Sequence, residues 1–249
     1  MSYPQIVLVI VDRVSAALRC FLKGRISSGS ILYQLCRRPS MWLRHHMPMY
    51  VANYRQRKGN GIFFREEELG MCSLLPDKVL AKTLQELKPL TILDVGCGTG
   101  QAVKWFLSQG CDVVGLEGSE LAIKHSEVGS YIRLHDLRKS IDLCRKFDLV
   151  WSFEVAEHLP ENSADCFVET LQRHGDRVVM SAAPPGQGGE GHLNEQPREY
   201  WIGKFEAKGW QLDQGLTQML QDTGDFLGMS ADSLKPSCGW WGDFRLVSC

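Results

Sequence analysis

From residue 91 onward, short apolar runs alternate with amphipathic stretches along the chain. The apolar runs predict strands at residues 91–96, 111–118, 130–137, 147–153, 176–184 and 240–248. Apolar positions at helical spacing predict helices near residues 74–87, 101–110, 119–127, 161–174 and 198–209. Strands that alternate with helices predict an α/β fold, in which a doubly wound, Rossmann-like parallel sheet carries helices on both faces.

The first 60 residues depart from this pattern and are interpreted as a basic, helical N-terminal arm on a domain at residues 61–249. The apolar opening, IVLVIVDRVSAALRCFL, is interrupted by Asp12 and Arg13, so it is too short and too charged to predict a membrane span. Basic residues follow the apolar run, whereas a secretory signal has them before it. A helix here would have one apolar face, which could lie in a membrane interface or pack against the body. The Arg-rich start leaves organelle targeting open.

The charge is distributed unevenly between the arm and the remainder. Residues 1–58 contain ten Lys and Arg and one acid, whereas the remainder contains 18 basic and 28 acidic residues. Two interpretations stay open, an arm that binds an anionic partner such as lipid head groups or nucleic acid, and an arm that folds back on the acidic body. The nine cysteines form no CxxC pair, which indicates free thiols in a reducing compartment. We therefore expect a cytoplasmic protein, either without membrane contact or peripheral to a membrane through its arm.

A glycine-rich turn follows the first predicted strand of the sheet, in the sequence ILDVGCGTGQ at residues 92–101. Glycines there allow the backbone to approach a ligand closely, at the carboxyl edge of the sheet. A dinucleotide fingerprint needs a sixth-position glycine, where this chain has Gln101, so an NAD oxidoreductase is disfavoured. Asp94 precedes the first glycine by two residues, which suits a ligand with a positively charged amine and not a pyrophosphate.

The segment LDVGCGTG resembles motif I of the class I S-adenosylmethionine (SAM)-dependent methyltransferases, and the resemblance covers the chain from about residue 74 onward. It implies a seven-stranded sheet with an antiparallel last strand, and SAM as the cofactor. In this family an acid at the end of the second strand holds the ribose hydroxyls, and an acid after the third lies near the adenine amine. The resemblance implies these cofactor-binding residues: Asp94, Gly96, Cys97, Gly98, Gly100, Glu117, Gly118, Asp136, Leu137 and Phe153. For Asp136, an ordinary solvated turn acid is the competing interpretation.

The fourth predicted strand ends in SFEVAEHL, which places two carboxylates and an imidazole beside the expected cofactor. Glu154, Glu157 and His158 are spaced i, i+3 and i+4, so one helical turn would bring them to one face. The same E-x-x-E-H pattern occurs in the ubiquinone-pathway O-methyltransferases and in small-RNA 2′-O-methyltransferases, where it helps to bind a divalent metal. By that resemblance, Glu154, Glu157, His158 and His192 form a candidate site for Mg²⁺ or Mn²⁺. Without a metal, Glu157 and His158 would brace the loop, and His158 or His192 would be a candidate general base.

The segment GHLNEQPREYWIGKFEAKGW is expected to form the acceptor loop, because it resembles a segment of methyltransferases encoded with glycan and natural-product pathways. Four glycines at positions 186, 188, 189 and 191 predict either a mobile lid or a plain surface connection. The sequence lacks the Asn/Asp-Pro-Pro-aromatic signature of amino methyltransferases after the fourth strand, so nucleobase amino methylation is disfavoured. We therefore expect SAM-dependent O-methylation of a small-molecule, glycan or lipid-linked acceptor. RNA 2′-O-methylation and a non-catalytic SAM-binding partner subunit are the alternatives, and nucleic acid is the less favoured partner.

Overall fold

The computed structural model of the chain describes residues 69, 75–187, 191–223 and 240–246. The structure divides the chain into two units, residues 1–58 and 59–249. The predicted N-terminal arm, its amphipathic helix and its linker lie outside the described residues, so they stay predictions. Within the described part of the chain, no helix is long and apolar enough to cross a membrane.

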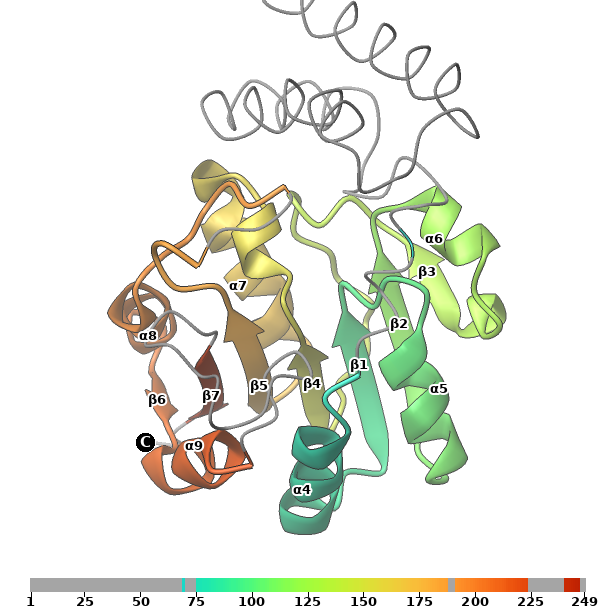
Figure 1. Ribbon diagram of the computed structural model, residues 1–249, viewed down its shortest axis with the longest axis horizontal. Coiled ribbons are helices and arrows are strands. Elements are labelled where there is room, and N and C mark those ends of the chain that lie inside the picture. The colour runs from blue at the N-terminus through green and yellow to red at the C-terminus, as the bar shows by residue number, and fades with distance from the viewer. Residues whose placement is uncertain (1–68, 70–74, 188–190, 224–239, 247–249) are drawn as a thin grey trace, which may run out of the picture. The chain divides into compact units, whose positions relative to one another are not determined.

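The described residues form a twisted sheet of seven strands in the order β3-β2-β1-β4-β5-β7-β6 (Figure 1). Neighbouring strands from β3 to β5 are parallel, and β7 is antiparallel to both β5 and β6. The predicted α/β fold with a parallel sheet is therefore confirmed. The strands span Thr91–Val95 (β1), Asp112–Glu117 (β2), Ile132–Leu134 (β3), Leu149–Ser152 (β4), Arg177–Ala182 (β5), Trp210–Leu212 (β6) and Trp240–Leu246 (β7).

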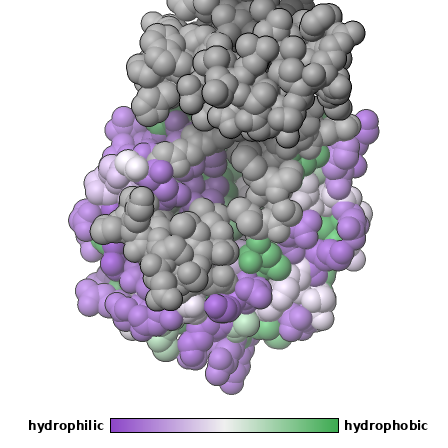
Figure 2. Space-filling view, viewed as in Figure 1, coloured by the Kyte–Doolittle hydropathy of each residue, from purple (hydrophilic) through white to green (hydrophobic). Residues whose placement is uncertain are grey.

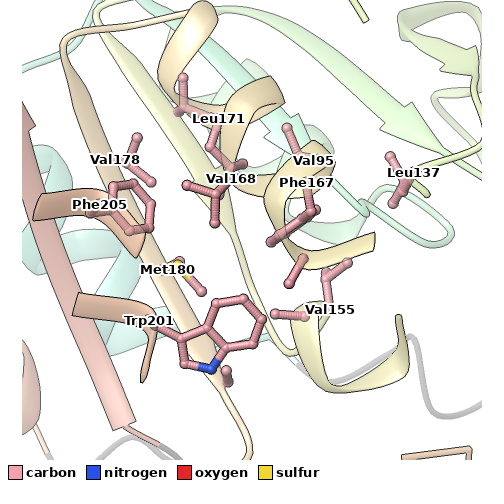
Figure 3. Close-up of a cluster of buried hydrophobic side chains, with 14 of the residues drawn as sticks. Val95, Leu137, Val155, Phe167, Val168, Leu171, Val178, Met180, Trp201 and Phe205 are labelled. Atoms are coloured by element: carbon pink, nitrogen blue, oxygen red, sulfur yellow. The ribbon is translucent and has the colours of Figure 1, made fainter. Parts of the chain in front are cut away.

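Helices pack against both faces of the sheet and bury its alternating side chains. One face carries α7 (Ala164–Arg173) and α8 (Arg198–Glu206), and the other carries α4 (Asp77–Leu87), α5 (Gln101–Ser108) and α9 (Gln214–Gln221). A short helix, α6 (Glu120–Lys124), follows β2. Figure 3 shows the first face, where side chains from α7, α8, β1 and β5 gather, namely Val95, Phe167, Val168, Leu171, Val178, Met180, Trp201 and Phe205.

The central strands are buried on both faces, as parallel strands covered by helices must be. All four residues of β4 are buried, and successive residues of β4 and β5 enter opposite cores. The outer surface differs sharply, because the described surface in Figure 2 is mostly hydrophilic. Among the described residues, the exposed large hydrophobic side chains are Leu90, Tyr131, Leu134 and Met219. The described cysteines, Cys97, Cys111, Cys144 and Cys166, are free thiols, as expected.

Two elements were not predicted from the sequence, the strand β6 and the helix α9. β6 has only three residues, of which Trp210 is buried and Gln211 exposed, so its alternation is too brief to distinguish from a loop. α9 is capped by Asp213, whose carboxylate accepts a hydrogen bond from Leu216 N at 3.1 Å. The predicted third strand is also shorter than expected, because a 3-10 turn at Gly129–Tyr131 takes its first residues.

Candidate functional site

The glycine turn between β1 and α5 has the left-handed backbone that its sequence predicts. Gly96, Gly98 and Gly100 have φ angles of 82°, 56° and 80°, which L side chains rarely adopt. The amides of Gly96 and Cys97 both donate to the carbonyl oxygen of Leu116 in β2, at 2.8 and 3.1 Å. The turn is therefore held against the carboxyl end of the neighbouring strand.

The turn also lies against the loop that follows β4. A Cβ atom built on Gly96 would lie 2.4 Å from one methyl carbon of Val155 and 2.6 Å from the other. Only a glycine leaves room for this contact, so Val155 fixes the distance between the glycine turn and the EVAEH loop, defined as Glu154–His158. This contact places that loop beside the predicted cofactor site.

Two buried carboxyl groups flank the glycine turn at the ends of β1 and β2. Glu117 accepts hydrogen bonds from Gly98 N at 2.8 Å and from Ser119 N at 2.7 Å, while burial raises its pKa. Asp94 is 2% exposed, and no described residue donates a hydrogen bond to its Oδ2. Burial, with the nearby Glu117 charge, raises the pKa of Asp94 to about 8. A buried acceptor without a donor fits a ligand that brings its own, such as the SAM amine.

The predicted adenine side of the site contains an ion pair that the sequence did not indicate. Asp136 Oδ1 accepts a hydrogen bond from Arg138 Nε at 2.7 Å, and Asp136 Oδ2 accepts one from Arg138 Nη2 at 2.9 Å. Burial raises the pKa of Asp136, but the Arg138 interactions outweigh this effect and leave it lowered. Leu137 is buried, so its side chain belongs to the core beneath this turn. A ligand amine would share Asp136 with Arg138.

The EVAEH loop begins with a strained residue. Glu154 has a φ of 51°, and its amide donates to Ser181 Oγ at 2.9 Å. Ser181 Oγ in turn donates to Glu154 Oε1 at 2.7 Å, so the side chain of Glu154 points toward the end of β5. The helical geometry begins only with the 3-10 turn Ala156–His158. The prediction that one helical turn brings Glu154, Glu157 and His158 to a single face is therefore wrong.

Three of the four predicted metal ligands nevertheless gather in space. One ligand atom each from Glu157, His158 and His192 lies within 4.8 Å of the others. The rings of His158 and His192 are 4.8 Å apart and nearly perpendicular, at 85°. Glu154, held by Ser181, is not part of this cluster of Glu157, His158 and His192.

Glu157 is fully buried near the Ala183 backbone and the Glu154 side chain, and neither of its carboxylate oxygens makes a well-formed hydrogen bond to a described residue. Burial, followed by the Glu154 charge, raises the pKa of Glu157 well above its usual value. Burial and the neighbouring His192 lower the pKa of His158 to about 3, so His158 is a neutral imidazole at physiological pH. A neutral imidazole beside an unpartnered carboxyl group is a chemically suitable donor set for a cation.

The predicted acceptor loop is joined to the EVAEH loop through the backbone of Glu157. Its carbonyl oxygen accepts hydrogen bonds from Leu193 N at 2.7 Å and from Asn194 N at 3.0 Å. These two bonds bring His192 to His158 from a distant part of the sequence. The other predicted residues, Cys97 and Phe153, are half-buried, and Gly118 is buried.

The family described as "Methyltransferase domain" matches residues 93–174, which contain the glycine turn, Glu117 and the EVAEH loop. The solved structure of magnesium protoporphyrin IX methyltransferase from Synechocystis PCC 6803 with bound SAH covers 69% of this chain and 82% of its own, with 19% identity and a TM-score of 0.51. Residues 93–174 therefore match a methyltransferase domain, and the fold of the described residues is similar to that of a solved methyltransferase.

The chain is also similar to a second solved structure, the TehB-like SAM-dependent methyltransferase of Corynebacterium glutamicum. That similarity covers 80% of this chain and all of the other, with 19% identity and a TM-score of 0.51. Among curated proteins, it is 27% identical over 136 residues to the ubiquinone biosynthesis O-methyltransferase of Alkalilimnicola ehrlichii. The alignment covers 49% of each chain, so the chain spans about half the length of that relative.

Several residues that shape the candidate site were not predicted from the sequence. Val155 packs on Gly96, Ser181 holds Glu154, Arg138 pairs with Asp136, and Glu195 contacts His192. No sequence feature indicated a role for Val155 or Ser181, because apolar residues in loops and serines at strand ends are common. The spacing between His192 and Glu195 could have indicated their contact, since three residues form one turn.

Proposed function

We propose that this methyltransferase transfers the methyl group of SAM to an oxygen atom of a small-molecule, glycan or lipid-linked acceptor. The observation that carries the proposal is the contact between Gly96 and Val155. Because Val155 belongs to the EVAEH loop, this contact supports a location of the cluster of Glu157, His158 and His192 beside the glycine turn. Two imidazoles and a carboxyl group at that place suit the activation of a hydroxyl. The curated relative, a ubiquinone biosynthesis O-methyltransferase, supports an oxygen acceptor.

The chain's own residues supply binding, alignment and proton transfer in this proposal. Bound SAM supplies an already activated methyl group on its sulfonium, so the protein has mainly to align the acceptor. In this proposal, Glu117 accepts hydrogen bonds from the ribose hydroxyls of SAM, and Asp94 binds its amine. Both carboxyl groups are buried beside the glycine turn, and Oδ2 of Asp94 has no hydrogen-bond partner among the described residues. His192 is the candidate group to take the proton from the acceptor hydroxyl, and His158 is a weaker candidate because its pKa is lowered to about 3.

A divalent cation fits the same cluster, since neither buried carboxylate oxygen of Glu157 makes a well-formed hydrogen bond to a described residue. We propose Glu157, His158 and His192 as its protein ligands, and Glu154 only if its bond to Ser181 breaks. The mixed nitrogen and oxygen donor set favours Mn²⁺ over Mg²⁺. Such a cation would lower the pKa of the acceptor hydroxyl and hold it near the methyl group.

The first experiment combines purified protein, radiolabelled methyl donor and a cell extract that has been divided into RNA, lipid, glycan and small-molecule fractions. Label in a non-RNA fraction is expected. Loss of label with EDTA, and its return with Mn²⁺ or Mg²⁺, would establish the cation. Label that survives EDTA would leave His158 and His192 as bases without metal.

Variants connect that activity to the cluster. Glu157→Gln and His192→Asn are expected to reduce label at least 100-fold while SAM binding persists, and His125→Asn, remote from the cluster, is the matched control. Label confined to RNA would replace this proposal with 2′-O-methylation. SAM binding with no label in any fraction would favour a non-catalytic partner subunit.

We also propose that the basic segment at residues 1–60 contacts anionic lipid head groups, which would bring lipid-linked acceptors near a peripheral enzyme. The support is the charge pattern, since ten of the 28 Lys and Arg lie within residues 1–58 with one acid.

A further inference from the structure

We propose that Glu195 is a positioning residue that sets the tautomer of His192. This inference deepens the proposed function and rests on it for its catalytic consequence. The tautomer itself is a property of the folded protein that can be measured without any substrate.

The geometry defines a carboxylate–histidine pair. His192 Nδ1 lies 2.8 Å from Glu195 Oε1, and the two side chains are only 11% and 20% exposed. An ionised carboxylate can only accept hydrogen bonds, so the proton of a neutral His192 ring must be on Nδ1. Nε2 is then left with its lone pair. That is the nitrogen able to bind a cation or to take a proton from a hydroxyl.

Glu195 is itself held in place by a second donor. Its Oε2 accepts a hydrogen bond from Gly186 N, nine residues earlier in the sequence, at 2.8 Å. One carboxylate thus receives two donors through separate oxygens, which fixes its orientation toward the ring. The ring of His158, another member of the cluster, is nearly perpendicular to the ring of His192, and the two ring centres are 4.8 Å apart.

The second donor makes Glu195→Gln an informative variant. A glutamine has one carbonyl oxygen, so it cannot accept from both Gly186 N and His192 Nδ1. If its oxygen remains on Gly186, its NH₂ group faces Nδ1 and forces the proton onto Nε2. Glu195→Ala removes the acceptor altogether, and Glu195→Asp retains a carboxylate on a shorter side chain.

The test is NMR of full-length protein with ¹⁵N-labelled histidine, kept metal-free with EDTA and saturated with SAM. His192→Asn assigns the His192 signals among those of the seven histidines. We expect His192 to carry its proton on Nδ1 in the native protein, and to move at least partly to Nε2 in the Gln and Ala variants. Glu199→Gln, an exposed glutamate in the first turn of α8, is the matched control and should change nothing.

Activity provides the second measurement. In the Gln and Ala variants kcat should fall about 10- to 100-fold with SAM affinity unchanged, and Glu195→Asp should recover part of it. An unchanged tautomer in both variants would overturn the proposal, and so would an altered tautomer with native kcat. If the native protein transfers no methyl group, the proposed function fails, whereas the NMR result still decides the role of Glu195.

Discussion

The Asp94 carboxyl group is not satisfied by the fold alone. It is 2% exposed, and burial together with the Glu117 charge raises its pKa to about 8. In the unfolded chain an aspartate has a pKa of about 4. As pH rises between these values, the unfolded state loses its proton while the folded state keeps it. Asp94 therefore destabilises the fold increasingly from about pH 4 to pH 8, and its effect is constant above that range.

Asp94→Asn should consequently raise the free energy of unfolding by about 1–2 kcal/mol at pH 8, because it removes a buried carboxyl group. The gain should shrink toward zero near pH 4. The same variant should lose SAM affinity, since the cofactor amine loses its anionic partner. Thermal unfolding from pH 4 to pH 8, with and without SAM, measures both effects, and Asp222→Asn at an exposed helix end is the control. Parallel pH profiles for variant and native protein would contradict this account.

The glycine turn between β1 and α5 combines two separate constraints at Gly96. Its φ is 82°, and an added Cβ would lie 2.4 Å from Val155. Gly110 has nearly the same φ of 85°, with nothing within 4 Å of an added Cβ. We expect Gly110→Ala to reduce stability by about 1 kcal/mol through backbone strain alone. Gly96→Ala should reduce it by about 3 kcal/mol, because overpacking adds to that strain.

A double-mutant cycle separates these contributions. Val155→Ala removes both clashing methyl groups, so Gly96→Ala should be less harmful in its presence, by about 1–2 kcal/mol. Chemical denaturation of the four proteins gives the coupling energy, and SAM titration shows whether the spacing of the two loops matters for binding. Additive effects of the two substitutions would mean that Val155 does not press on the turn.

The cap of α9 gives a third prediction at the scale of elements. Asp213 accepts from Leu216 N at 3.1 Å through one oxygen and from Arg177 at 3.0 Å through the other. Asp213→Ala should lower the free energy of unfolding by about 1–2 kcal/mol, since it loses the cap. Asp213→Asn should lose less than half of that, because asparagine caps nearly as well. Equal losses in urea denaturation would assign the effect to the Arg177 pair.

Local pattern predicted most elements, and tertiary contacts explain the rest. The strands β1, β2, β4 and β5 and the glycine turn follow from apolar runs and glycine spacing, which are properties of neighbouring residues. β6 and α9 were missed, since three residues of strand and one cap give little periodicity. Glu154 was assigned to a helical face because spacing alone cannot show its contact with Ser181, 27 residues later. The likeness to methyltransferases, and not the pattern, indicated His192 as a neighbour of His158.

Across the whole molecule, charge is divided between two segments of the chain. Residues 1–58 carry ten basic residues and one acid, whereas the remainder carries 28 acids against 18 basic residues. An anionic surface attracts the basic segment at residues 1–58 and repels the acidic remainder of the chain. This opposition makes the proposed membrane contact specific to one part of the chain and dependent on salt.

We therefore expect the full-length protein to sediment with vesicles that contain phosphatidylglycerol but not with pure phosphatidylcholine vesicles, and to be released by about 0.5 M salt. Arg37→Glu with Arg38→Glu should weaken vesicle binding by roughly 30-fold or more, at about 1 kcal/mol for each basic side chain removed. Lys124→Glu with Lys208→Glu changes the net charge equally within the acidic remainder, so it should have a much smaller effect. If both pairs weaken binding alike, overall charge and not the basic segment determines the contact. If RNA binds the protein and vesicles do not, the lipid proposal fails and the basic segment favours a nucleic-acid acceptor.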